Sequence, residues 1–129
     1  MIQKEITICN KKVHIAYCYA TEINFNVLTD ENVLDFISQA VIAIQNERPE
    51  ELNQRKTLYL IFASLTAYYE YNALEAPITD KDLLFDASAN DVAMALLTII
   101  TMYNEFYKVS SGEPKDKEPN KKRGKKKNA

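Results

Sequence analysis

Glycine is missing from the first 109 residues of this chain, whose two glycines are Gly112 and Gly124. Glycine adopts positive φ more easily than any other residue, and the tight turns of β-rich folds need positive φ repeatedly. A body without glycine therefore favours helices with capped ends over a turn-rich β fold. It also lacks the usual glycine-rich loop that cradles phosphates, which argues against the common nucleotide-binding motifs.

The charges of the chain separate into two regions. Residues 1–109 carry 8 Lys and Arg against 15 Asp and Glu, whereas residues 110–129 carry 8 against 3. The first region thus has a formal net charge of −7 and the second of +5. Because an acidic body repels a phosphate backbone, nucleic acid is an expected partner only through the C-terminal segment.

The composition predicts one folded domain over residues 1–109 and a disordered basic tail over residues 110–129. The tail has no large apolar residue, so burial cannot offset the entropy lost on ordering it. The most apolar run covers residues 92–102, well short of the roughly 20 residues that a membrane-spanning helix needs. The N-terminus lacks the apolar core of a signal peptide, so we expect a cytoplasmic protein that does not enter a membrane.

Two alternating stretches predict a β-hairpin over residues 4–19. Apolar side chains recur at every second position and form one face: Ile6, Ile8, Val13, Ile15, Tyr17 and Tyr19. A tight turn over residues 10–12 joins the strands, with Asn10 as the residue that takes positive φ. An isolated hairpin is marginal in water, so this one packs on helices or lends its edge to another chain, which makes self-association possible.

Apolar residues at three- and four-residue spacing predict helices over residues 30–46, 49–73, 80–86 and 89–108. Residues 20–28 predict only a short helical turn. Thr29 or Asp30 is expected to cap the first helix, and Pro49 to occupy the first position of the second. The predicted inner face of the first helix consists of Val33, Leu34, Ile37, Val41 and Ile44.

The second half of the helix over 49–73 is apolar on nearly all sides, which predicts that it lies at the centre of the fold. Thr79 with Asp82, and Ser88 with Asp91, have the spacing of capping boxes for the last two helices. The predicted fold class is α+β, mainly α. It has an N-terminal β-hairpin packed on a small bundle of about three long and two short helices.

Few side chains are candidates for catalysis or metal binding. His14 is the only histidine and lies on the predicted hairpin near Cys9, and such a pair can act as base and nucleophile. No third group orients the pair, so an ordinary histidine and two free thiols, Cys9 and Cys18, are the favoured interpretation. The acids of residues 80–86 lack the glycine and final glutamate of a calcium loop, so helix capping explains them better. We expect no enzyme, no cofactor and no metal.

Tyrosine is unusually frequent, with eight tyrosines and no tryptophan. Three of them, Tyr68, Tyr69 and Tyr71, point in different directions from one helix, so at least one should lie at the surface. Exposed tyrosines are common at protein interfaces. We interpret Tyr59 and Tyr69 as core residues, and Tyr68 and Tyr71 as candidate partner-binding residues.

The order of these features resembles that of phage and prophage tail assembly chaperones, small proteins encoded near the tape-measure gene. The resemblance runs through "YATEINF" (19–25), "TAYYEY" (66–71), "EAPITDKDLLFDAS" (75–88) and "YNEFYKV" (103–109) into the polar "GEPKDKEP" segment. Its motifs are structural and include no catalytic signature. It implies a non-enzymatic protein that binds tape-measure and tail-tube protein during tail assembly in the bacterial host cell, and that is absent from the mature virion.

Two alternatives concern the basic tail. The protein can be a small nucleic-acid-associated regulator whose tail docks on RNA or DNA, which predicts salt-sensitive binding that is lost when residues 110–129 are deleted. Alternatively, the sequence of the tail is dictated by the messenger RNA that encodes it. Tail chaperones in many phages occur in two lengths made by ribosomal frameshifting, and Lys127-Asn128 with the preceding lysine can be encoded by a slippery string. An ordinary solubilising tail is the other interpretation.

Overall fold

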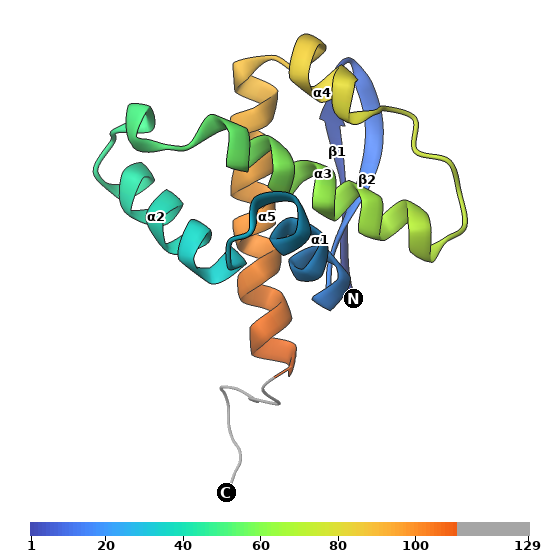
Figure 1. Cartoon of the computed structure of the whole chain (residues 1–129), viewed down its shortest axis with the longest axis horizontal. Coiled ribbons are helices and arrows are strands. Elements are labelled where there is room, and N and C mark those ends of the chain that lie inside the picture. Colours follow the sequence, from blue (N-terminus) through green and yellow to red (C-terminus); the bar gives the residue numbers. More distant parts are fainter. Residues whose placement is uncertain (111–129) are drawn as a thin grey trace, which may run out of the picture.

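The computed structural model describes residues 1–110, with side chains up to Lys108. Its elements are β1 (Ile2–Ile8), β2 (Lys11–Tyr17), α1 (Tyr19–Thr29), α2 (Val33–Gln45), the 3-10 turn η1 (Pro49–Glu51), α3 (Gln54–Tyr71), α4 (Asp80–Asp86) and α5 (Ala89–Ser110). The predicted fold class is confirmed: an antiparallel two-stranded hairpin packs on a mainly helical body (Figure 1). The tail predicted for residues 110–129 lies outside the described residues from position 111 onward.

The hairpin is shorter than predicted at its C-terminal end. Ile2 pairs with Tyr17 and Ile8 with Lys11, so the loop is Cys9–Asn10 rather than residues 10–12. Asn10 takes positive φ as predicted (61°), and Cys9 does so as well (54°). Two consecutive residues with positive φ form the turn whose twist matches that of the flanking strands.

The hairpin is held by two helices. Val13, Ile15 and Tyr17 are completely buried, and the Tyr17 ring contacts Tyr103 and Phe106 of α5 at centroid distances of 5.7 and 5.5 Å. The backbone N–H of His14 in β2 donates to the Tyr69 hydroxyl of α3 at 3.2 Å. Because α5 covers the apolar face and α3 supplies an acceptor for β2, the marginal hairpin gains the burial that it lacks alone.

The central position of α3 follows from its composition. It packs against α1, β2, α4 and α5, and Figure 1 shows it crossing α5 in the middle of the molecule. Its buried residues point to more than one side of the helix: Thr57, Leu60, Ile61, Ala63, Ser64, Leu65, Ala67 and Tyr69. A helix that is apolar nearly all round must be covered on all sides, which is why the other elements gather on it.

Residues 20–28 form a full helix, α1, and not the short turn that the sequence predicted. Thr21 and Phe25, one turn apart, are completely buried, whereas Ile23 and Val27 on another side of the same helix are exposed. Because apolar residues occupy both sides, no single stripe marks the helix in the sequence. Tyr19, predicted to end the second strand, is instead the first residue of α1.

The predicted start of the next helix was also wrong. Asp30 ends α1: it has φ 62°, and its N–H donates to the Asn26 carbonyl at 2.7 Å. Asn32 then begins α2, because its side-chain oxygen accepts the Leu34 N–H at 2.7 Å. The α2 face turned inward is rotated from the prediction, since Phe36 packs on Phe25 at 5.6 Å between ring centroids while Leu34 stays exposed.

The long helix predicted over residues 49–73 is interrupted. Pro49 opens η1 as a first-position proline, but α3 begins only after Asn53, whose side chain accepts the Lys56 N–H at 3.0 Å. The two later capping predictions are correct. Thr79 and Asp82 exchange hydrogen bonds at the start of α4, and Ser88 accepts the Asp91 N–H at 3.1 Å at the start of α5.

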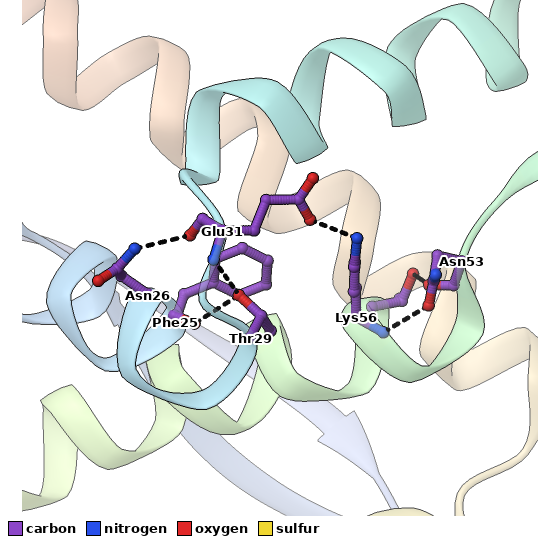
Figure 2. A network of polar contacts seen from close by, with 7 residues as sticks. Phe25, Asn26, Thr29, Glu31, Asn53 and Lys56 are labelled. Carbon is purple, nitrogen blue, oxygen red and sulfur yellow. Dashed lines mark hydrogen bonds and ion pairs between the residues drawn. The ribbon is translucent and has the colours of Figure 1, made fainter.

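A polar network fixes the turn between α1 and α2 on the start of α3 (Figure 2). Lys56 Nζ lies 2.6 Å from Glu31 Oε1, a buried oxygen for which this ammonium group is the only partner among residues 1–110. The Glu31 N–H donates to Thr29, and the Asn26 side chain donates to the Glu31 carbonyl. This network sets the point at which α2 turns away from α1.

Besides Asp30 at the end of α1, two helix ends carry a non-glycine residue in a conformation that favours glycine. Ala73 (φ 54°) follows α3, and Glu47 (φ 55°) follows α2. We predict that Ala73→Gly raises the free energy of unfolding by about 1 kcal/mol, because it relieves the left-handed backbone of a side chain. Urea unfolding measures the change. Ala87→Gly is the control: Ala87 has φ −73°, so glycine there should lower stability.

Lys56→Met keeps the aliphatic stem but leaves the buried Glu31 oxygen without a donor. We expect a loss of about 1–3 kcal/mol in the free energy of unfolding, and recovery of most of it in the double variant Lys56→Met/Glu31→Leu. The Arg48–Glu51 pair is the control, with side chains 62% and 47% exposed. Arg48→Met should cost less than about 1 kcal/mol. Equal losses in both single variants would contradict the role given to Lys56.

Candidate functional site

A groove with a volume of about 720 Å³ opens between α1, the start of α2 and the C-terminal half of α5. Three apolar or aromatic side chains of its wall are strongly exposed: Tyr19 (61%), Ile23 (61%) and Leu34 (52%). The groove is lined by Tyr19, Glu22, Ile23, Asn26, Asn32, Val33, Leu34, Tyr103 and Tyr107.

The junction between β2 and α1 fixes the position of α1, which forms one wall of the groove. Thr21 is fully buried, and its hydroxyl donates to the Ala16 carbonyl at 2.8 Å and accepts the Cys18 N–H at 3.3 Å. These two bonds tie the first turn of α1 to the end of β2. They hold Glu22, in that first turn, next to the ring of Tyr17.

Glu22 joins three elements of the fold. Its Oε2 accepts a hydrogen bond of 2.7 Å from the Tyr17 hydroxyl of β2, and the Tyr107 hydroxyl of α5 donates to the same oxygen. The position near the N-terminus of α1 also favours a negative charge, because the first N–H groups of a helix carry partial positive charge. Among the described residues that line the groove, Glu22 is the only charged one.

Aromatic rings surround this carboxylate. Tyr103 and Tyr107 of α5 lie 4.9 Å apart between ring centroids, and Phe106 contacts both Tyr107 and Tyr19 at 5.2 Å. We call Tyr19, Glu22, Tyr103 and Tyr107 the aromatic corner of the groove. The corner combines one anionic group with three electron-rich ring systems.

Three tyrosines around Glu22, namely Tyr17, Tyr103 and Tyr107, are held in the protonated form. Burial raises the pKa of Tyr17 and Tyr107, and the hydrogen bond that each donates to Glu22 raises it further. Burial also raises the pKa of Tyr103, with a smaller contribution from the negative charge of Glu22. The hydroxyls therefore act as hydrogen-bond donors and not as bases at physiological pH.

The two tyrosines predicted to bind a partner do not line this groove. Tyr68 is half-buried and engaged within the protein: its ring stacks on His14 at 4.7 Å and contacts Tyr69 edge-on at 4.9 Å. Tyr71, at the end of α3, is 72% exposed. Tyr69 is buried as expected, whereas Tyr59 is only half-buried beneath the Arg55 guanidinium. Partner binding by Tyr68 or Tyr71 stays a prediction.

His14 and Cys9 have separate environments. The Cys9 thiol donates to the Asp82 carbonyl of α4 at 3.4 Å, while the His14 ring stacks on Tyr68 of α3. Burial and the carboxylates of Asp82, Asp86 and Asp91 raise the pKa of Cys9, which is the opposite of what activates a nucleophilic thiol. Both cysteines are free thiols. Within residues 1–110, no three His, Cys, Asp or Glu side chains gather as a metal site.

The groove residues were not predicted from the sequence. Tyr103 and Tyr107 continue the apolar spacing of the last helix, yet Tyr107 is 38% exposed. The available signal was the spacing of Tyr19, Ile23 and Val27, which places a second apolar stripe on a helix that already buries Phe25. A helix needs only one apolar side to pack against the core, so a second apolar side is left exposed.

No family model, curated protein or solved structure significantly matches the chain. The helices of residues 1–110 also include none with the length and apolar character needed to cross a membrane.

The raised pKa values of Tyr17, Tyr103 and Tyr107 predict a fall in stability at alkaline pH. These groups hold their protons more tightly when folded, so their contribution is present below the ordinary tyrosine pKa of about 10 and is lost as the pH rises above it. Urea unfolding between neutral and alkaline pH measures the fall, and tyrosinate absorbance reports the titration. Ionisation of Tyr17, Tyr103 and Tyr107 in the folded protein at the ordinary tyrosine pKa would contradict the prediction.

Proposed function

We propose that this protein is a non-enzymatic tail assembly chaperone that binds tape-measure protein, or tail-tube protein, during phage tail morphogenesis. The observation that carries the proposal is the groove beside α1, whose wall leaves Tyr19, Ile23 and Leu34 exposed to solvent. The resemblance of the sequence to tail assembly chaperones supplies the biological setting. The groove supplies a surface on which such a protein can hold its client.

The exposed side of α1 is suited to binding rather than to folding. Tyr19, Ile23 and Val27 follow one another at intervals of one helical turn, and their exposed fractions are 61%, 61% and 77%. Folded proteins that act alone seldom leave a continuous apolar stripe in water, and such a stripe beside a groove marks an interaction surface. Leu34 extends it on the far wall of the groove.

An amphipathic helix is the ligand that this surface fits. A helix presents apolar side chains at every third or fourth residue, and a groove between diverging helices accepts such a row lengthwise. Long, aggregation-prone proteins such as a tape-measure protein expose such rows until they assemble. Covering these rows in the groove would keep the client soluble without any chemical step.

Nucleic-acid binding gains no support from the residues that the structure describes. Residues 1–109 carry 15 acids against 8 bases, and the charged residue that lines the groove is Glu22. Phosphate backbones are attracted by the opposite pattern. We therefore do not extend the proposal to nucleic acid.

The test is co-expression with the tape-measure protein of the same tail module. The wild-type chain should keep that protein soluble and co-purify with it. Ile23→Asp places a charge in the apolar wall and should reduce recovery of the complex about tenfold or more, because burying an unpaired charge opposes binding.

Leu84→Asp is the matched control. Leu84 lies on α4 and is 63% exposed, against 61% for Ile23, so both substitutions add the same charge at equally exposed positions. Circular dichroism and thermal unfolding should show both variants folded. Equal loss of the complex in both variants would remove the groove from the proposal. Absence of any complex with the wild-type chain would overturn the function itself.

A further inference from the structure

We propose that the aromatic corner is a subsite for one cationic side chain, the lysine or arginine of an amphipathic helix in the protein that the groove binds. This inference rests on the proposed function and specifies the chemistry of the client. In this arrangement, Ile23 and Leu34 contact the apolar face of the client helix. The aromatic corner binds the positively charged side chain at the edge of that face.

The polar groups of the groove wall that the structure describes include one charge, that of Glu22. The Asn26 side chain donates to the Glu31 carbonyl, and the Asn32 side chain caps α2. Each amide is thus engaged with the backbone through one of its two polar atoms, and neither carries a charge. Glu22 differs, because both of its tyrosine hydrogen bonds end on Oε2 and a carboxylate has a second acceptor oxygen, Oε1.

The environment of Glu22 strengthens its attraction for a cation. The groove wall around it is made largely of aromatic and aliphatic side chains, and charges attract one another more strongly where water is partly excluded. Tyrosine rings attract a nearby ammonium or guanidinium group through their negative faces. Carboxylate and rings therefore favour the same kind of ligand from the same corner.

Charge complementarity extends beyond the corner. The described body carries about twice as many acids as bases, 15 against 8 over residues 1–109. A client helix with lysine or arginine beside its apolar face would approach a surface of opposite sign. A client helix with an acid at that position would face Glu22 directly, so the corner also excludes the wrong partner.

The experiment uses two synthetic peptides and the full-length chain. One peptide is an amphipathic helix with a single lysine beside its apolar face, and the other has glutamine in place of that lysine. Isothermal titration calorimetry should show about tenfold tighter binding of the lysine peptide to the wild-type chain. Glu22→Gln should abolish this preference while keeping the affinity for the glutamine peptide.

Glu70→Gln is the matched control, since it removes one negative charge from an exposed position of α3 away from the groove. The preference for lysine should survive in this variant. Tyr107→Phe, which removes one hydroxyl from Glu22 but keeps the ring, should bind both peptides and keep the preference. An unchanged preference in Glu22→Gln, an equal loss in Glu70→Gln, or no binding of either peptide would each overturn the subsite.

A third peptide with the sequence of residues 111–129 separates a client from the chain's own basic segment. It should not displace the lysine peptide, because it has no apolar face for Ile23 and Leu34. Displacement that depends on Glu22 would overturn the assignment to a client helix. The subsite and the proposed function can fail separately. A lysine preference without any tape-measure complex refutes the function alone, and a complex without the preference refutes the subsite alone.

Discussion

The fold depends on the burial of α3. This helix has apolar side chains on nearly every side, so it can exist in water only when α1, β2, α4 and α5 cover it together. Polar contacts at its edges fix β2 and the turn that follows α1. The Tyr69 hydroxyl accepts the His14 N–H of β2, and Lys56 neutralises Glu31 in the turn before α2. The groove follows from these contacts, because they fix the turn at which α2 leads away from α1.

Sequence reasoning found the elements whose signal is local. The apolar second half of α3, the alternation of the hairpin, and the capping pairs that begin α4 and α5 all lie within a few residues of one another. It misplaced the boundaries around α1 and α2 because the residues there have two possible roles. Thr29 and Asp30 are good caps for a following helix, yet Asp30 ends the preceding one in a left-handed conformation. With no glycine to mark helix ends, polar residues such as Asp30 and Glu47 take that role, and they resemble helix starts in the sequence.

The candidate site could not be predicted from neighbouring residues in the sequence. Tyrosine enrichment drew attention to the cluster in α3, where Tyr68 packs on His14. The groove instead combines residues from α1, α2 and α5 that are distant in the chain. Glu22 receives one hydrogen bond from a tyrosine 5 residues away and one from a tyrosine 85 residues away. Only the packing of α5 on the hairpin brings the second tyrosine to the first, and no spacing in the sequence encodes that contact.

The negative charge of Glu22 is not required for the stability of the fold. A leucine there, with phenylalanine in place of Tyr17 and Tyr107, would bury the same corner without desolvating a carboxylate, and such apolar replacements of buried charged groups are often neutral or stabilising. Folding alone therefore does not require a charge in this wall. The exposed apolar wall of Tyr19, Ile23 and Leu34 has the same property, since solvent contact with these side chains adds nothing to the core. Two features that folding does not need, an apolar wall and an anion, meet in one groove. Their combination is what a ligand with an apolar face and one positive charge requires.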